Sequence, residues 1–399
     1  MTVFADALSS LPTARPEEVG LSRAALQRLC DVMEREIAAT RAPGAVMLIS
    51  RHGKVAFSRA LGALRPHGPP MTEEAIFRIY SMTKPIVSVA AMTLVEEGKL
   101  LITDPLAKYI PAFAGTKVGV ENGDELELVA PKRPITIQDL LRHTSGLTYG
   151  FTGSSKVQRL NLAAGLMTQT KTAGDHVEAL AALPLRFQPG EVWEYGHSTD
   201  VLGRVVELVA GRSLGEFLGE RLFEPLGMSD TAFYVPGSKW GRYAQPFSFD
   251  PLIAAGIDLI ESRDPPRCEF GGGGLVSTVG DYARFLAMVS GGGSLGSARI
   301  LGSRTLAFMA SDHLAPHVVK DHPLLWPGHG FGLGFAVRTD AGLAPTAGSV
   351  GEFFWGGVAG TVFWVSPRDA LFAILMVQAP EYREYFRTLF RNLVNAAIV

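Results

Sequence analysis

The sequence predicts an α+β fold in which an antiparallel sheet, made from both ends of the chain, is flanked by helices and carries a mostly helical insertion. Two strand-like runs near the N-terminus, 44–50 and 54–62, are joined by a short polar turn, a pattern typical of a β-hairpin. A second pair near the C-terminus, 360–366 and 370–377, flanks "PRD" in the same way. Because both chain ends carry this pattern, we expect them to share one sheet.

An amphipathic helix is expected beside each hairpin. Ser22 can cap the first one, since a serine hydroxyl accepts a hydrogen bond from the free N–H groups of a helix start. The apolar stripe of this helix is Leu26, Leu29, Cys30, Met33 and Ile37. The apolar face of the helix near the C-terminus is Tyr382, Tyr385, Phe386, Leu389, Phe390, Leu393 and Val394. Apolar residues at this spacing form one helix face that faces the protein interior.

The middle of the chain shows helical rather than strand periodicity. "TIQDLLRHTSGL" begins with a capping box from Thr136 to Asp139, in which each side chain bonds the backbone of the other. The stretch 198–210 has a helical apolar stripe and is followed by Gly211, a common residue just after a helix. We therefore expect a mostly helical domain at 85–265, and an α/β domain formed by 1–84 and 266–399.

Composition excludes several classes of function. Hydrophobic residues make up 47% of the 399 residues and the formal net charge is −2, so neither nucleic acid nor an anionic membrane is an expected partner. The first 20 residues lack a basic segment followed by a long apolar one, so we expect no signal peptide. The only cysteines, Cys30 and Cys268, have no metal-binding spacing. We expect a cytoplasmic protein whose cysteines are reduced.

The candidate nucleophile lies in "IFRIYSMTKPIV", where Ser81 precedes Lys84 by three residues. Pro85 suits the first turn of a helix, and an apolar stripe follows it until Gly98. Residues three apart share a helix face, so Lys84 can reach the Ser81 hydroxyl. A helix N-terminus and burial both disfavour a charged lysine, and a neutral lysine can act as base for a serine nucleophile. Alternatively, Ser81 is only a cap and Lys84 a solvated side chain.

Two other serines match the lipase-like pattern G-x-S-x-G. Ser213 lies in "GRSLG", directly after a helical stretch, and Ser294 lies in the glycine-rich "GGSLG". A nucleophile of that class needs a strand, a sharp turn and then a helix, and neither serine has this context. Ser213 is expected to cap the helix that follows it. The nine histidines are scattered and lack the spacing of a zinc-protease motif, so no metal site is expected.

The order of four motifs resembles one known superfamily. They are "FRIYSMTKPIV", "PITIQDLLRHTSGL", "FQPGEVWEYGHSTDVLGRVVE" and "GGGGLVSTVGDYARF". This order is similar to that of serine β-lactamases and penicillin-binding proteins, and most similar to the family VIII carboxylesterases, which are class C β-lactamase-like. The resemblance covers nearly the whole chain. It implies a β-lactamase/transpeptidase-like fold, with Ser81 as nucleophile and Lys84 as base.

The resemblance also implies roles for residues of the third motif and of a later stretch, "EFFWGGVAGTVFWVSP". Tyr195 matches a tyrosine that exchanges protons with the nucleophile and leaving group. His197 stands where β-lactamases have an asparagine, so efficient β-lactam hydrolysis is not expected. Trp355, Gly356 and Gly357 match the Trp-Gly-Gly that family VIII esterases carry in place of Lys-Thr-Gly.

The resemblance further implies an oxyanion hole and an acyl pocket. The backbone N–H groups of Ser81 and Val358 would form the oxyanion hole. The expected walls are Tyr149, Phe151, Phe353 and Trp355, with His197 in a structural or wall role. Rings this large next to the serine leave little room, so we expect acyl chains of about two to six carbons, the order of size that such a pocket holds.

The resulting hypothesis is a serine carboxylesterase that acts on small-molecule esters through an acyl-enzyme and needs no cofactor. Three alternatives stay open at this point: a β-lactamase or D-amino-acid peptidase of the same fold, an acyltransferase, and a binding protein that is acylated without turnover. A binding protein would give one stoichiometric burst of product, whereas an esterase would turn over. The oligomeric state is left open.

Overall fold

The computed structural model describes residues 11–168, 170–247 and 262–399. Residues 1–10 lie outside the described residues. They are the first half of the N-terminal stretch that is not expected to be a signal peptide. The segment 248–261, which falls within the expected helical domain, also lies outside the described residues. None of the described helices is both long enough and apolar enough to cross a membrane.

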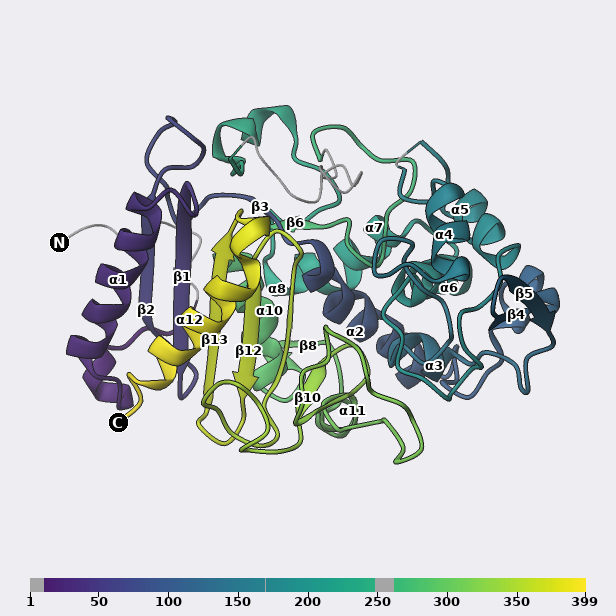
Figure 1. Cartoon of the computed structure of the whole chain (residues 1–399). Helices are drawn as coiled ribbons and strands as arrows, with labels where there is room; N and C mark the ends of the chain where they lie inside the picture. The colour runs from purple at the N-terminus through teal and green to yellow at the C-terminus, as the bar shows by residue number, and fades with distance from the viewer. Residues whose placement is uncertain (1–10, 169, 248–261) are drawn as a thin grey trace.

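A seven-stranded antiparallel sheet joins the two ends of the chain (Figure 1). Its order is β2-β1-β13-β12-β11-β10-β9, and β1 pairs with β13 over seven residue pairs, from Ala45–Val377 to Arg51–Leu371. The strands are β1 (Gly44–Arg51), β2 (Lys54–Gly62), β9 (His329–Phe331), β10 (Ala336–Arg338), β11 (Phe353–Gly356), β12 (Val362–Ser366) and β13 (Leu371–Val377). Both predicted hairpins are therefore confirmed, and so is the single sheet.

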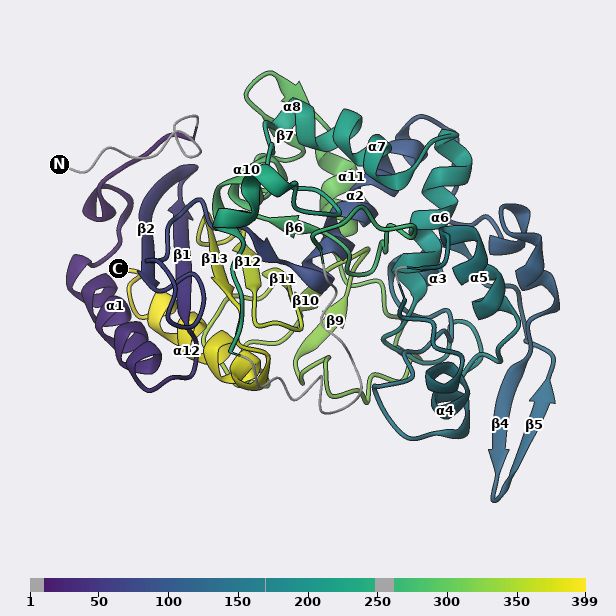
Figure 2. The same ribbon diagram turned by 90° about the horizontal axis from the view of Figure 1, so that it is seen from above.

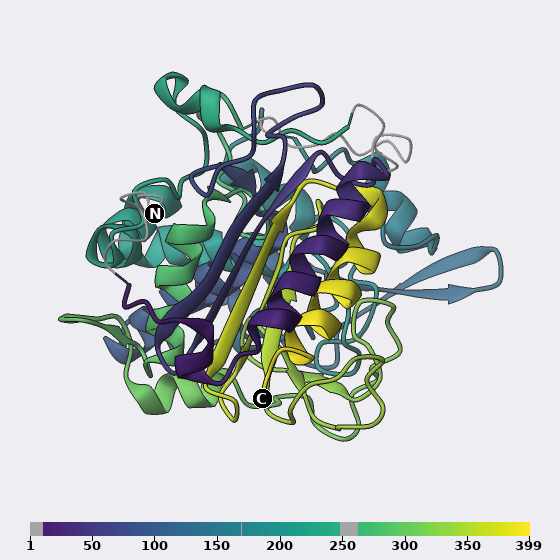
Figure 3. The same cartoon turned by 90° about the vertical axis from the view of Figure 1, so that its left-hand side faces the viewer.

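Two helices cover one face of this sheet. Helices α1 (Arg23–Ala38) and α12 (Arg383–Asn395) lie side by side on it (Figure 3). The Ser22 hydroxyl caps α1 by accepting from the Ala25 N–H, as predicted. Apolar side chains of the two helices pack with strands β1, β12 and β13 in one core cluster, which includes Leu29, Phe386 and Trp364.

The other face packs against the rest of the molecule through α2 (Thr83–Glu96) and α10 (Val279–Ser290). Helix α2 lies between the sheet and the helical region (Figure 2). Nearly all of its residues are buried, because it packs against the helical region and its apolar side chains share a core cluster with residues of the sheet such as Phe353 and Phe363. The helix begins close to Ser81, as predicted, and it ends at Glu96, two residues before Gly98, whose φ is +69°.

The middle of the chain is mostly helical, as predicted. Its helices are α3 (Ile137–Leu141), α4 (Lys156–Ala163), α5 (Ala173–Ala181), α6 (Ser198–Ala210), α7 (Leu214–Leu218) and α8 (Glu224–Leu226), with a π-helical turn at Gly219–Phe223. The predicted Thr136–Asp139 capping box starts α3, and Gly211 ends α6 in a left-handed conformation. The domain boundaries at residues 84/85 and 265/266 stay predictions.

Smaller elements complete the described part of the chain. The hairpin β4 (Val118–Asn122) with β5 (Glu125–Val129) projects from the helical region (Figure 2). Strand β3 (Phe77–Arg78) pairs with β6 (Val276–Ser277), and β7 (Ser294–Leu295) pairs with β8 (Ala298–Arg299). Helix α11 (Ser303–Met309) and 3₁₀ turns at Pro16–Val19, Tyr80–Met82, Leu106–Lys108, Pro111–Gly115, Gly237–Arg242 and Pro380–Tyr382 account for the rest.

A buried ionic group fixes α12 to the edge of the sheet. The Glu352 carboxylate accepts from Arg338 at 3.2 Å and from Arg391 at 2.7 Å, and none of the three side chains is more than 6% exposed. Removing the acid from such a group leaves buried cations without their partner, which is far more costly than losing an exposed ion pair.

We expect Glu352→Gln to lower the free energy of unfolding by about 3 kcal/mol, measured by urea denaturation. The matched control is Glu18→Gln, because Glu18 forms an exposed pair with Arg15. This change should cost less than about 1 kcal/mol. Equal effects of the two substitutions would show that the buried group does not hold α12 in place.

Candidate active site

The predicted nucleophile lies on a tight turn between β3 and α2. Ser81 is the middle residue of the 3₁₀ turn Tyr80–Met82, which runs directly into α2. The preceding residue, Tyr80, has φ +43°, a conformation that is strained for any residue other than glycine. The turn is held by the Tyr282 hydroxyl, which donates to the Met82 carbonyl at 3.0 Å. The serine is therefore presented on a rigid, strained turn.

Lys84 is buried under the serine, with only 1% of its surface exposed. Its Nζ lies 3.4 Å from the Ser81 Oγ, 3.2 Å from the Tyr149 hydroxyl and 2.6 Å from the Gly272 carbonyl oxygen. A neutral amine has two N–H donors and one lone pair. With its donors on Gly272 and Tyr149, the lone pair is left for the hydrogen of the Ser81 hydroxyl. The geometry thus suits a base for this serine.

Two tyrosines flank the lysine in different ways. The Tyr195 ring lies under the ammonium position, with its centroid 4.5 Å from Nζ, and its hydroxyl accepts from the Trp355 indole N–H at 3.3 Å. Tyr149, which the sequence placed only in the pocket wall, contacts Lys84 through its hydroxyl. Burial, reinforced by the nearby Asp200 carboxylate, raises the pKa of Tyr149 well above 10. Tyr149 therefore keeps its proton at neutral pH.

A buried carboxylate connects the partners of the lysine. Asp200, in the first turn of α6, accepts from the Gly272 N–H at 2.8 Å, the Tyr149 hydroxyl at 3.3 Å and the His197 Nδ1 at 3.1 Å. Burial acts to raise the pKa of Asp200. The hydrogen bond from His197 and the electrostatic effect of the neighbouring side chains outweigh burial and lower this pKa to about 2. Asp200 is therefore ionised at neutral pH.

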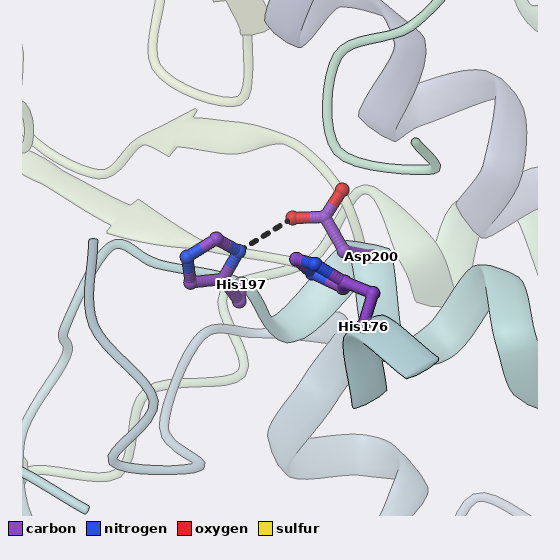
Figure 4. A group of neighbouring side chains, drawn as sticks. All are labelled: His176, His197 and Asp200. Carbon is purple, nitrogen blue, oxygen red and sulfur yellow. Dashed lines mark hydrogen bonds and ion pairs between the residues drawn. The ribbon is translucent and has the colours of Figure 1, made fainter. Parts of the chain in front are cut away.

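His176, His197 and Asp200 are the one group in the described part of the chain with the composition of a metal site (Figure 4). All three are buried, and one ligand atom from each lies within 4.8 Å of the others. Burial, and then the nearby His197, lower the pKa of His176 to about 4. A neutral imidazole is the form that binds metals. Both Asp200 oxygens, however, already accept hydrogen bonds.

The end of β11 forms the wall opposite α2. At Gly357, an added Cβ would lie 2.3 Å from the Ile79 carbonyl oxygen, so only glycine allows this strand to approach the serine turn so closely. The Gly357 carbonyl accepts from the Gly360 N–H at 2.9 Å and also from the Arg387 guanidinium. Within a trans peptide the C=O and N–H point in opposite directions. Fixing this carbonyl therefore fixes the direction of the Val358 N–H.

A cavity of about 810 Å³ opens beside the serine. Of the predicted site residues, those that line it are Ser81, Tyr149, Phe151, Tyr195, His197, Trp355, Gly356 and Val358. Lys84 lies behind this lining, in contact with Ser81. Phe353 does not line the cavity, because its ring packs in the core against Phe335, with centroids 5.0 Å apart. The neighbouring Phe354 lines it instead.

The two alternative serines lie outside the lining of this cavity. Ser213 caps α7, as predicted, and its hydroxyl accepts from the Glu216 N–H at 3.2 Å. Ser294 lies in the short strand β7. Neither serine has a lysine or histidine among its hydrogen-bond partners within the described residues.

Three contributors to the site were not predicted from the sequence: Asp200, Gly272 and the hydroxyl of Tyr149. Asp200 lies five residues after Tyr195, on a helix that was predicted, so its place near the site could have been inferred. Gly272 belongs to the motif "GGGGLVSTVGDYARF", in which no residue was assigned a role from the sequence. An added Cβ there would lie 2.7 Å from the Asp200 carboxylate and 2.8 Å from the Tyr149 hydroxyl.

Comparison with known proteins places this geometry in a family. Residues 30–398 match the family described as Beta-lactamase. Esterase EstB of Burkholderia gladioli is 32% identical over 384 residues, which cover 90% of this chain and 92% of that protein. Protein Rv1367c of Mycobacterium tuberculosis is 36% identical over 325 residues, which cover 78% of this chain and 79% of that protein.

The solved structure of EstCE1, described as a hydrolase with promiscuous acyltransferase activity, gives the same result. It aligns with a TM-score of 0.79 at 28% identity, over 93% of this chain and 98% of that chain. The family match, the EstB relative and this structure agree with the predicted β-lactamase/transpeptidase-like fold. The chain therefore belongs to the Beta-lactamase family, in its family VIII esterase branch, and is a serine hydrolase.

Proposed function

We propose that this protein is a carboxylesterase that hydrolyses small esters through an acyl-enzyme on Ser81. The observation that supports this most directly is the buried Lys84 amine, 3.4 Å from the Ser81 Oγ at the edge of an 810 Å³ cavity. EstB, which is similar over nearly its whole length, is named an esterase. A relative from Penicillium rubens, 30% identical over 82% of this chain, is named lovastatin esterase.

The proposed reaction begins when Lys84 accepts the proton of Ser81 as its Oγ attacks the ester carbonyl. The negative charge that develops on the carbonyl oxygen is stabilised by the N–H groups of Ser81 and Val358. Tyr195, which lines the cavity, carries the proton onward to the leaving alcohol. Water then attacks the acyl-enzyme by the reverse sequence of proton transfers. Every step uses residues of this chain, and none is assigned to a cofactor.

The proposed substrates have a short acyl group, of about two to six carbons, because the rings of Tyr149, Phe151 and Trp355 line the cavity beside the serine. A series of p-nitrophenyl esters of increasing length tests this choice.

Transfer of the acyl group to an alcohol is a second candidate activity, because EstCE1 is described as having promiscuous acyltransferase activity. Adding an alcohol to the same assay and measuring the new ester separates the two. We also propose a cytoplasmic location, because the first 20 residues do not resemble a signal peptide and the two cysteines are expected to be reduced.

Ser81→Ala is expected to lower kcat/KM for p-nitrophenyl butyrate by more than roughly 1,000-fold, the order of loss when a serine nucleophile is removed. Ser213→Ala and Ser294→Ala are the matched controls, and both should keep most of the activity. A fluorophosphonate adduct mapped by mass spectrometry should lie on Ser81. An adduct on Ser213 or Ser294 would refute the assignment.

Lys84→Arg is expected to lower kcat/KM by at least roughly 100-fold, the usual contribution of a general base. A guanidinium stays protonated and cannot accept the serine proton, although arginine is also long and basic. Lys54→Arg is the control, since Lys54 is exposed on β2. If Lys84→Arg retained substantial activity, another group would have to be the base.

Esters are expected to be better substrates than β-lactams. In β-lactamases the lysine of Lys-Thr-Gly holds the substrate carboxylate, whereas the corresponding Trp355 offers only a neutral indole N–H. The Arg387 guanidinium, which also lines the cavity, is already paired with Glu384 at 2.8 Å. A hydrogen bond to a charged group is worth roughly 1.5–3 kcal/mol. Its loss should weaken binding by roughly 10- to 150-fold.

The measurement is kcat/KM for p-nitrophenyl butyrate, nitrocefin and benzylpenicillin on one preparation of the enzyme. The ester should be turned over fastest, with β-lactam hydrolysis absent or limited to the activated cephalosporin. A penicillin that equalled the ester would favour the β-lactamase alternative instead.

A further inference from the structure

The two contacts that Lys84 makes besides Ser81 both lead to the same carboxylate. The Gly272 carbonyl accepts from Lys84 at 2.6 Å, and the N–H of the same residue donates to the Asp200 Oδ1 at 2.8 Å. The Tyr149 hydroxyl lies 3.2 Å from Lys84 and donates to the Asp200 Oδ2 at 3.3 Å. Asp200 therefore restrains the lysine along two independent paths.

Asp200 is itself held from the opposite side. His197 approaches the Asp200 Oδ2 with Nδ1 at 3.1 Å, and His176 packs edge-on against His197, with ring centroids 5.2 Å apart (Figure 4). The carboxylate lies in the first turn of α6, where the helix dipole favours a negative charge. These contacts leave Asp200 little freedom to move, so it can act as a fixed anchor.

We propose that Asp200 is a positioning residue: through Gly272 and Tyr149 it holds the Lys84 amine against Ser81, and its negative charge sets the pH range in which Lys84 works as a base. This inference rests on the proposed function. Asp200 does not touch the reacting atoms, so it is not a catalytic residue. Its effect reaches the serine only through the lysine.

A metal ion held by His176, His197 and Asp200 is the competing explanation of this cluster. It is less favoured, because the Asp200 oxygens already accept from Gly272, Tyr149 and His197. The hydrogen-bonded arrangement needs no additional group.

The sign of the pH effect follows from the charges around the lysine. The groups that face Lys84 are Tyr149, Tyr195, His143 and Asp200. Tyr149 keeps its proton, because burial and then Asp200 raise its pKa well above 10. His143 stays neutral, because burial and then Lys84 hold its pKa well below 6.5. Asp200 is thus the charged acid nearby, and it favours the protonated lysine.

Other charged or titratable groups lie near Asp200. Besides Tyr149 and His143, they are His197, His176, Lys84 and Cys268. Burial, followed by the nearby Asp200, raises the pKa of Cys268, so this thiol stays neutral. Removing the charge of Asp200 therefore makes the neutral, basic form of Lys84 easier to reach. The acid limb of the pH–rate profile should then move to lower pH.

The test is the pH dependence of kcat/KM for p-nitrophenyl butyrate in Asp200→Asn and Asp200→Glu. In Asp200→Asn the plateau should fall by at least roughly 10-fold, because positioning is lost, and the acid limb should move down by about one pH unit. Asp200→Glu keeps the charge but displaces the carboxylate. Its plateau should fall while the acid limb stays in place.

Asp281→Asn is the matched control, since Asp281 is also a buried carboxylate, near the start of helix α10. It should leave the acid limb unchanged. If Asp200 had a purely structural role, Asp200→Asn would have a lower melting temperature and a lower plateau of kcat/KM, but the acid limb of its pH profile would not move. This outcome would overturn the proposal. If Asp200→Asn does not fold, Tyr149→Phe serves as the second variant, because it removes one of the two paths from Asp200 to Lys84. The plateau of kcat/KM should still fall in Tyr149→Phe, and an unchanged plateau would also overturn the proposal.

A second readout separates this inference from the proposed function. The rate at which a fluorophosphonate labels Ser81 depends on activation of the serine but not on which substrate the enzyme prefers. If wild-type protein fails to hydrolyse esters, the proposed function fails, yet the pH profile of labelling should still shift in Asp200→Asn. If esters are hydrolysed and neither profile shifts, the inference about Asp200 fails alone. Loss of activity with a chelator, or zinc retained in stoichiometric amount, would favour the metal explanation and contradict ours.

Discussion

The burial of one lysine amine determines how the site is assembled. A Lys84 side chain that is only 1% exposed has lost its contacts with water, so its nitrogen needs hydrogen-bond partners inside the protein. They come from three separate segments: the serine turn, the loop after α3 that carries Tyr149, and the loop at Gly272. These segments have to meet at one point. Any displacement of one of them leaves a buried polar group without a partner.

The sheet provides the rigid frame against which this point is defined. Because β1 pairs with β13, strands from the two ends of the chain form one surface, and β11 lies two strands away from β13. The end of β11 contacts the serine turn at Gly357, where no side chain fits. Arg387 of α12 also binds the Gly357 carbonyl, so a helix on the far face of the sheet helps to fix the wall beside the serine.

Elements that depend on local rules could be predicted from the sequence. The start of α2 close to Ser81 follows from Pro85 and the apolar stripe, and the caps at Ser22 and Thr136 follow from the side-chain chemistry of helix starts. The fold and its family followed from the order of the motifs. The roles of Ser81, Lys84 and Tyr195 remain predictions that the geometry suits.

The remaining parts of the site depend on contacts between distant residues. Lys84 meets Tyr149 across 65 positions and Gly272 across 188, and no local pattern contains such a pairing. Phe353 and Phe354 show the same limit on a smaller scale. Both are aromatic residues within two positions of Trp355, yet the first packs against Phe335 in the core and the second lines the cavity.

The two tyrosines beside the lysine illustrate how surroundings divide similar side chains between roles. Tyr149 is held between Lys84 and a carboxylate, and its pKa is raised, first by burial, so it serves as a fixed donor that does not release its proton. The Tyr195 hydroxyl contacts only the Trp355 indole among the described residues, and the side chain lines the cavity where a leaving group would depart. A hydroxyl that is not tied to a carboxylate is freer to exchange its proton. The structure therefore favours Tyr149 for holding the base in place and Tyr195 for moving protons.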